Sequence, residues 1–238
     1  MSATSPVVKS EHLAVGHGGQ AVLSEMNLTI VEGETLGVVG RSGTGKTTLL
    51  QTLAGITNPI SGKANVLGTD LPQRPPGGDV GYIPQSLGLV PHMTVLRSVL
   101  LGTLPRLGTL DSLLGRFPAS AESDAAEAIE MVELDGTDDR RVKSLSGGQQ
   151  RRVAIARALV QRPRLLLADE MLSELDMATA QSIIDCLERL QAETEMSVVI
   201  VEHDLSVLQS LADRLLVIED GTLVAWEDAT TLEVSGDD

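Results

Sequence analysis

The first third of the chain alternates between apolar and polar positions. Residues 7–15 and 21–31 do this with many β-branched side chains, and glycines cluster between them at 16–19. This pattern predicts two strands joined by a turn. Further strands are expected at 35–39, in a hairpin over 60–72 and at 80–83, and a helix is expected from Thr47 to about Ile56.

The pattern changes after Gln85. Residues 92–161 have helical periodicity and almost no strand pattern. The clearest helices are predicted at 95–101, 120–134 and 149–161, and residues 102–119 are expected to form a looser loop with short helical pieces.

Apolar runs that suit buried strands return in the last third of the chain. They lie at 165–168, 197–201 and 215–218, and helical segments at 177–193 and 204–212 separate them. Such alternation predicts an α/β fold, with a mostly parallel sheet flanked by helices on both faces. An antiparallel β subdomain is expected near the N-terminus. We expect a single domain over 1–238, in which 1–85 and 156–238 form the α/β core and 86–155 form an inserted helical lobe.

Composition narrows the class of protein. Hydrophobic residues make up 42% of the 238 residues, so a sizeable core can be buried, and with only 1% aromatics it must be aliphatic. No apolar run approaches the roughly 18 residues of a membrane span, and no signal-peptide core is seen at Met1–Ser10, so a soluble cytosolic chain is expected. The single Cys186 is expected to be a small buried hydrophobe on a helix. The net charge of −15 argues against nucleic-acid binding, which needs a basic surface.

The first candidate site follows the predicted strand at 35–39. The sequence Gly40-Arg41-Ser42-Gly43-Thr44-Gly45-Lys46-Thr47 fits the phosphate-loop pattern G-x-x-x-x-G-K-[ST]. Glycines let backbone N–H groups close around phosphate oxygens, and the following helix points its positive end at the same anion. Lys46 supplies a charge for the phosphates, and the Thr47 hydroxyl suits Mg²⁺.

The second candidate site decides the class of nucleotide enzyme. The stretch Leu145-Ser146-Gly147-Gly148-Gln149 resembles the LSGGQ signature of the ATP-binding cassette (ABC) ATPases. Ser146 is placed to cap the predicted helix 149–161, so this segment also presents N–H groups to an anion. The apolar run Leu165–Ala168 ends in Asp169 and Glu170, which resembles the Walker B motif. Neighbouring strand residues point in opposite directions, so the two acids can have different roles.

The resemblance to ABC ATPases covers nearly the whole chain and implies a role for each motif. Catalysis is assigned to Glu170, which polarises the attacking water, to the switch histidine His203 and to the Q-loop residue Gln85. Mg²⁺ is assigned to Thr47, Gln85 and Asp169. ATP is assigned to the phosphate loop and its next residue, to an adenine-stacking position and to the signature, namely Gly40, Arg41, Ser42, Gly43, Thr44, Gly45, Lys46, Thr47, Thr48, His17, Ser146, Gly147, Gly148 and Gln149. Ser173–Asp176 resembles the D-loop, which crosses the dimer interface in this family.

Three departures from the family pattern bear on these roles. Met171 and Leu172 follow Glu170, where the family commonly has Pro and Thr. Glu174 replaces a small residue of the D-loop, and His17 stands where an aromatic side chain usually stacks on adenine. These departures leave open a regulatory cassette that binds ATP and turns it over slowly.

The resemblance also implies partners. ABC cassettes work as head-to-tail pairs on separate membrane permease subunits, which places this chain peripherally on the cytoplasmic side of the cell membrane, together with a substrate-binding protein if it serves an importer. The stretches Leu87–Val95 and Leu113–Phe117 look like those of phosphonate-type importer ATPases. Another cargo (an amino acid, a metal or another oxyanion), lipoprotein release and efflux remain open, as does a soluble ABC ATPase of DNA repair or translation.

Overall fold

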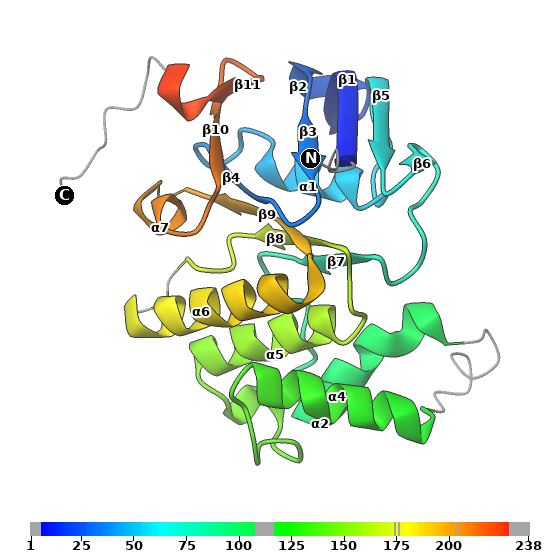
Figure 1. The fold of residues 1–238 in the computed structure, drawn as a ribbon, viewed down its shortest axis with the longest axis vertical. Helices are drawn as coiled ribbons and strands as arrows, with labels where there is room; N and C mark the ends of the chain where they lie inside the picture. The colour runs from blue at the N-terminus through cyan, green and yellow to red at the C-terminus, as the bar shows by residue number, and fades with distance from the viewer. Residues whose placement is uncertain (1–5, 108–116, 174, 176, 204, 229–238) are drawn as a thin grey trace.

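The computed structural model describes residues 6–107, 117–173, 175, 177–203 and 205–228. These form two sheets and a group of helices (Figure 1). The N-terminal sheet is antiparallel and centres on the long strand β1, which pairs with β2, β3 and β5, while β6 pairs with β5. Its strands are β1 (Pro6–His17), β2 (Gln20–Met26), β3 (Thr29–Val31), β5 (Ser61–Val66) and β6 (Thr69–Asp70).

The second sheet has six strands in the order β11-β10-β4-β9-β8-β7. All of its pairings are parallel except the β10–β11 hairpin. Its strands are β4 (Thr35–Val39), β7 (Val80–Ile83), β8 (Leu165–Asp169), β9 (Ser197–Glu202), β10 (Arg214–Glu219) and β11 (Thr222–Ala225). Because five neighbouring strands run the same way, the loops that follow them emerge at one edge of the sheet.

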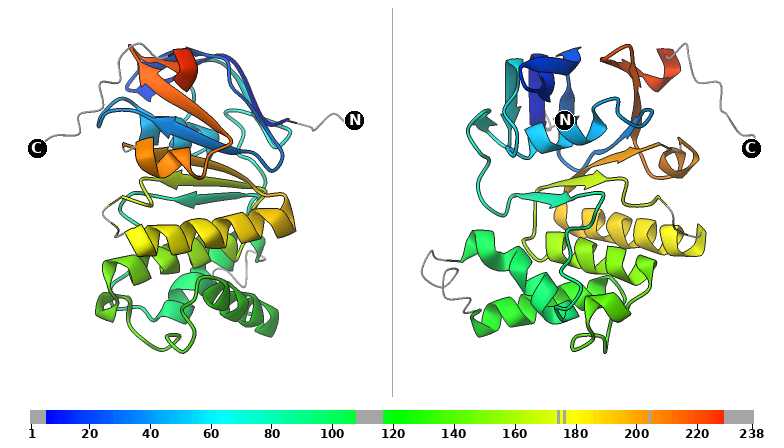
Figure 2. Two further views of the ribbon diagram at one scale, coloured as in Figure 1. Left: turned by 60° about the vertical axis from the view of Figure 1, so that its left-hand side comes forward. Right: turned by 180° about the vertical axis from the view of Figure 1, so that it is seen from behind.

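Helices cover both faces of the six-stranded sheet. The α-helices are α1 (Lys46–Leu53), α2 (Val95–Leu100), α4 (Ala119–Met131), α5 (Gly147–Leu159), α6 (Met177–Thr194) and α7 (Leu205–Gln209). Short 3-10 turns are η1 (Leu101–Arg106), η2 (Val142–Ser144) and η3 (Trp226–Asp228). In Figures 1 and 2, α1 lies between the two sheets, whereas α5 and α6 lie on the opposite face with α2 and α4 beyond them.

The core is split by the sheet into two apolar clusters. Along β8, Leu165 and Leu167 point into the cluster that contains Leu49 of α1, while Leu166 and Ala168 point into the cluster built with α5 and α6. This alternation is what a strand buried on both faces requires, and it explains the continuous apolar run in the sequence. Within the described residues, no helix is long and apolar enough to cross a membrane.

The predicted fold class, an α/β core with an antiparallel sheet and a group of helices in the middle of the chain, is confirmed. Several details differ. The strand predicted at 21–31 is two strands, because Asn27 leaves the ladder and accepts the His12 N–H with its side chain. The first helix ends at Leu53 because Gly55 takes φ +67 and the Ile56 N–H turns back to Gln51.

Strand β11 was missed by the pattern analysis. Asp220 and Gly221, with φ of 46 and 76, form the tight turn that joins it to β10. An Asp-Gly pair at a strand end is a hairpin signal that could have found it. The last helix, α7, is shorter than the predicted 204–212, and residues 108–116 of the predicted loop lie outside the described part of the chain.

Candidate active site

The phosphate loop leaves the carboxyl end of β4 and leads directly into α1. Gly43 and Gly45 have φ of 82 and 103, a region that side chains disfavour. A Cβ on Gly45 would lie 2.9 Å from Val22 Cγ2 and 3.0 Å from Leu23 Cγ, so only glycine fits there. Gly45 is also the N-cap of α1 and brings no side chain to that helix end. The first N–H groups of α1 therefore remain available to an anion.

Lys46 lies beneath this loop and is 5% exposed. Its Nζ donates to the carbonyl oxygens of Gly40, at 2.5 Å, and of Arg41, at 3.1 Å, and lies 3.7 Å from Glu170 Oε1. The loop thus wraps around a single ammonium group, and Arg41, Ser42, Gly43 and Thr47 are exposed above it. A ring of backbone N–H groups around a fixed positive charge suits phosphate.

Asp169 is the last residue of β8 and is 1% exposed. Both of its carboxylate oxygens are buried and, among the described residues, make no hydrogen bond of full geometry. Burial raises the pKa of Asp169, and the nearby Thr47 hydroxyl and Lys46 charge act against that shift. An unsatisfied buried carboxylate is unfavourable unless a cation neutralises it. Oxygen donors of this kind, beside the Thr47 hydroxyl, fit Mg²⁺.

Glu170 is held from several elements at once. Its Oε2 accepts a 2.6 Å hydrogen bond from the Gln85 side chain, which follows β7, and its Oε1 faces Lys46. Its N–H donates to the Val201 carbonyl of β9 at 2.9 Å. The structure therefore brings Gln85, Lys46, Asp169 and Glu170 together at the carboxyl edge of the sheet, although they are far apart in sequence.

His17 and Thr48 meet beside this site. His17, the last residue of β1, is exposed, and its Nε2 lies 2.9 Å from the hydroxyl of Thr48 in α1. The ring is thus anchored to the helix that follows the phosphate loop. His203 directly follows β9 and is exposed at the same edge of the sheet. The adenine-stacking role of His17 and the switch role of His203 stay predictions.

The signature segment is not part of this constellation. Ser146 caps α5, its hydroxyl accepting the Gln149 N–H while the Gln149 side chain accepts the Ser146 N–H, which confirms the predicted cap as a reciprocal capping box. Ser146, Gly148 and Gln149 line a hollow of about 310 Å³ whose other walls are Glu133, Leu134, Arg152 and Thr179. No phosphate-loop residue lines that hollow. The phosphate loop and the signature therefore lie at different places on the surface of the chain.

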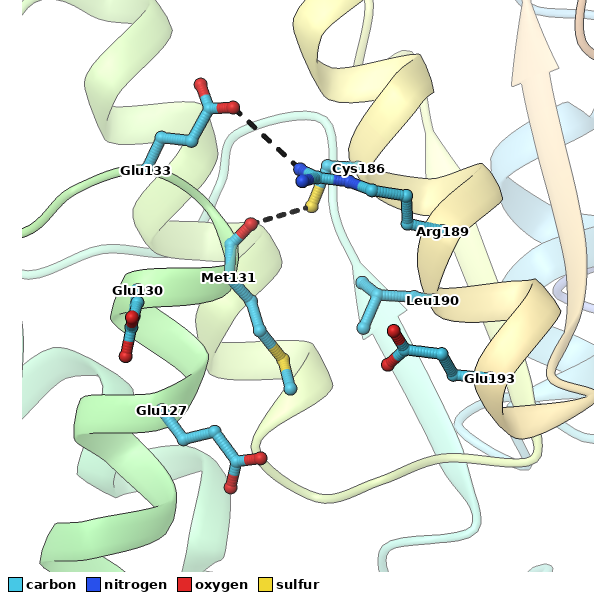
Figure 3. A pocket seen from close by; sticks show the side chains of 8 residues that line it. All are labelled: Glu127, Glu130, Met131, Glu133, Cys186, Arg189, Leu190 and Glu193. Atoms are coloured by element: carbon cyan, nitrogen blue, oxygen red, sulfur yellow. Dashed lines mark hydrogen bonds and ion pairs between the residues drawn. The ribbon is translucent and has the colours of Figure 1, made fainter.

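A different hollow, of about 450 Å³, lies between α4 and α6 (Figure 3). Four glutamates line it, Glu127, Glu130, Glu133 and Glu193, with Arg189 facing Glu133 at 3.8 Å. Cys186 is buried there, as expected, and its thiol donates to the Met131 carbonyl oxygen. Glutamates repel phosphate, so this hollow does not suit a nucleotide.

The departures after Glu170 are core residues. Met171 is fully buried and Leu172 is 2% exposed, both in the cluster built with α5 and α6. Ser173 donates its hydroxyl hydrogen bond to the Glu170 carbonyl oxygen at 2.8 Å. Glu174 and Asp176 of the predicted D-loop lie outside the described residues.

Three residues near the site were missed by sequence reasoning. Tyr82 lies against Asp169, and burial followed by the charge of Asp169 raises the pKa of its hydroxyl. Arg151 donates to the Glu170 carbonyl oxygen at 2.8 Å, and the buried Glu202 accepts the Leu172 N–H at 2.8 Å. Of these three residues, Glu202 could have been noticed in the sequence, since it is a charged residue at the end of an apolar strand. The contacts of Tyr82 and Arg151 become visible only in the tertiary structure.

Fold and site define an ATPase of the ATP-binding cassette class. The profile of the ABC transporter family matches residues 23–173, and the chain belongs to that family. It is 37% identical to the phosphonates import ATP-binding protein PhnC of Bdellovibrio bacteriovorus over 232 residues, covering 94% of this chain and 89% of that protein. It is 41% identical to the spermidine/putrescine import ATP-binding protein PotA of Methylococcus capsulatus over 209 residues. That match covers 87% of this chain and 52% of PotA.

Solved structures agree on the fold. The ADP conformation of the cassette MJ1267 superposes with a TM-score of 0.79 at 26% identity, covering 93% of this chain and 91% of that chain. A dimeric cassette, MJ0796, in a post-hydrolysis state bound to ADP and Pi has a TM-score of 0.76 at 29% identity, with coverages of 91% and 96%.

Proposed function

We propose that this chain is the ATP-hydrolysing subunit of an ABC importer. The observation that carries the proposal is the gathering of the phosphate loop, Asp169, Glu170 and Gln85 at one sheet edge while the signature is presented elsewhere. Because the signature lies away from the phosphate loop, one chain can bind a nucleotide at the phosphate loop. A signature from another chain is then needed to enclose that nucleotide. The ABC transporter family profile supports the ATPase reading.

In this proposal each group of residues has a distinct task. Residues Gly40–Thr48 bind the phosphates of ATP through N–H groups and Lys46, and His17 packs against the adenine. Mg²⁺ would be held by Thr47, Gln85 and Asp169, and would supply positive charge to the phosphate oxygens. Such electrostatic stabilisation is the main catalytic need in phosphoryl transfer.

Glu170 accepts the proton of the attacking water. Its carboxylate has the chemistry of a general base, and its oxygens are already oriented by Gln85 and Lys46. His203 would donate to the terminal phosphate. The balance of the step is simple: water adds to the terminal phosphorus, the bond to ADP breaks, and the water proton passes to Glu170.

A second copy of the chain would complete the site. In a head-to-tail pair, Ser146–Gln149 of one copy face the nucleotide bound by the other, and the capped amino end of α5 meets the phosphates. The dimeric relative MJ0796 supports this arrangement. Opening and closing of the pair would drive membrane permease subunits that dock near Gln85, with the chain peripheral on the cytoplasmic face.

The proposed cargo is a phosphonate or similar small oxyanion, delivered by a substrate-binding protein. The Leu87–Val95 stretch and the likeness to PhnC support it. Other relatives are named for other cargoes: methionine for MetN 1 of Burkholderia lata, which is 37% identical over 216 residues, and polyamines for PotA. The match spans 60% of MetN 1, so longer relatives contain parts that this alignment does not reach.

The test is reconstitution with candidate permease subunits from the same organism. Vesicles holding the permease and a binding protein should show ATP turnover that rises when a phosphonate is added. Stimulation by methionine or a polyamine instead would reassign the cargo and keep the importer role. Turnover indifferent to every permease, with recovery of the chain on ribosomes or DNA, would overturn the importer role.

A further inference from the structure

The signature helix makes a direct contact with the catalytic segment of its own chain. Arg151, in the second turn of α5, donates from Nη1 to the Glu170 carbonyl oxygen at 2.8 Å. We propose that Arg151 is a positioning residue for Glu170 and that it couples the two ATP sites of the dimer. The inference rests on the proposed head-to-tail pair.

The Glu170 backbone needs such support. Its φ is +49, in the left-handed region that a side chain other than glycine disfavours. Conformations of this kind are unfavourable and persist only where their surroundings enforce them. The catalytic carboxylate is therefore in place because neighbouring groups hold the peptide, and those groups determine where it points.

Among the described residues, four hydrogen bonds involve the backbone of segment 170–173. Arg151 Nη1 and Ser173 Oγ both donate to the Glu170 carbonyl oxygen, each at 2.8 Å. The Glu170 N–H donates to Val201, and the Leu172 N–H donates to Glu202 Oε1 at 2.8 Å. Of these partners, Arg151 alone belongs to the signature helix, and at 9% exposed it is a nearly buried cation.

The helix connects Arg151 rigidly to the signature. α5 is continuous from Gly147 to Leu159, and its capping box fixes Ser146 and Gln149 to its first turn. Arg151 comes two residues after Gln149. When Ser146–Gln149 engage the nucleotide of the other copy, any tilt or shift of α5 reaches the Glu170 carbonyl through the Arg151 side chain. Because coupling is reciprocal, the state of Glu170 also affects how well this signature binds.

Arg152 supplies a matched control on the same helix. It donates to Val132 O at 2.9 Å, to Glu133 at 2.8 Å and to Ser182 at 2.8 Å, so it joins α5 to α4 and α6. None of these bonds reaches segment 170–173. Arg152→Met therefore removes a partly buried guanidinium, 16% exposed, with its hydrogen bonds, much as Arg151→Met does, and leaves the contacts of Glu170 in place.

The experiment measures ATP turnover of the full chain against ATP concentration for wild type, Arg151→Met, Arg151→Lys and Arg152→Met. A displaced catalytic group costs about 100-fold in rate, so Arg151→Met should lower kcat by about 10- to 100-fold while KM changes by less than about threefold. Its Hill coefficient should fall toward 1. Arg151→Lys, which keeps one donor, should recover part of kcat and of the cooperativity.

Arg152→Met should lower kcat and the Hill coefficient less than Arg151→Met does, because every contact of segment 170–173 remains. If Arg151→Met and Arg151→Lys match Arg152→Met in kcat and in cooperativity, the inference is wrong while the importer ATPase role stands. A wild-type chain without ATP turnover or without cooperativity would instead overturn the proposed paired ATPase. Fluorescent-ATP binding to each variant confirms folding, and Arg151→Lys keeps the test decisive if Arg151→Met does not fold.

Discussion

The side-chain amide of Gln85 donates a 2.6 Å hydrogen bond to the carboxylate of Glu170. Gln85 lies at the junction between β7 and the helices that follow, whereas Glu170 follows the neighbouring strand β8. A movement of those helices relative to the sheet therefore acts on the proposed catalytic base directly. The second Glu170 oxygen faces Lys46 Nζ at 3.7 Å. A phosphate bound at Lys46 would therefore compete with Glu170 for the positive charge of Lys46.

Glu170→Gln should abolish hydrolysis and keep ATP binding. The amide has nearly the shape of the carboxylate but cannot accept the water proton, and loss of a general base costs about 100- to 10,000-fold in kcat. With ATP bound and not consumed, the closed pair should accumulate. Light scattering with and without ATP measures the dimer, and unchanged turnover would remove Glu170 from the role of base.

Asp169→Asn should stabilise the nucleotide-free chain and remove its response to Mg²⁺. Among the described residues, the buried wild-type carboxylate makes no hydrogen bond of full geometry, so a neutral amide should gain about 1 kcal/mol or more in unfolding free energy. Because burial raises the folded-state pKa of Asp169, wild type loses stability as pH rises through that range, and the gain should be larger at pH 8 than at pH 4.

Asp213→Asn is the control for that prediction. Asp213 accepts the Thr35 N–H at 2.8 Å and is exposed, so its amide variant should gain nothing. Thermal unfolding with ATP, with and without Mg²⁺, gives both readouts. A destabilised Asp169→Asn chain, or one still stabilised by Mg²⁺ in the presence of ATP, would contradict the assignment.

Glu202→Gln should remove one pH dependence of stability. Burial raises the pKa of Glu202 to about 7, from 4.5, so the folded chain retains this proton more strongly than the unfolded chain. Stability from this group is full below about pH 4.5 and is lost as pH rises to about 7. Glutamine keeps an oxygen acceptor for the Leu172 N–H, and it should be more stable than wild type at pH 8 by up to about 3 kcal/mol. Urea unfolding at pH 5 and pH 8 measures this, and an equal difference at both would refute it.

Gly147→Ala and Gly148→Ala should distinguish the contribution of the signature to the stability of the single chain from its contribution to the dimer. A Cβ on Gly147 meets nothing within 4 Å, whereas one on Gly148 would lie 2.9 Å from Thr179 Cγ2. Gly147→Ala should therefore leave the stability of the single chain unchanged, or raise it by less than about 1 kcal/mol, and Gly148→Ala should lower it.

Turnover then tests the role of the signature. If Gly147 faces a nucleotide on a second copy, Gly147→Ala should lower hydrolysis despite an intact fold, while ATP binding to the single chain persists. Thermal unfolding and steady-state turnover are the two measurements. Wild-type turnover in a stable Gly147→Ala chain would show that this position does not approach the nucleotide.

Much of the fold follows from local patterns in the sequence. The run Leu165–Ala168 is apolar at every position because both faces of β8 are buried, and the same holds for β9. The phosphate loop could be located because its glycines follow a strand and precede a helix, which is a local requirement. The cap at Ser146 was also predictable, since a capping box involves only residues three positions apart.

Tertiary structure decided the relationships between distant segments. The burial of the Asp169 carboxylate, the hydrogen bond from the Leu172 N–H to Glu202 and the hydrogen bond from Arg151 to Glu170 all depend on strand register and on how α5 packs against the sheet. No periodicity encodes such contacts, because each joins residues whose separation in sequence has no fixed relation to distance. The sequence determined which chemical groups this ATPase has and at which element ends they stand, and the packing of α5 against β8 and β9 decided which of them act on one another.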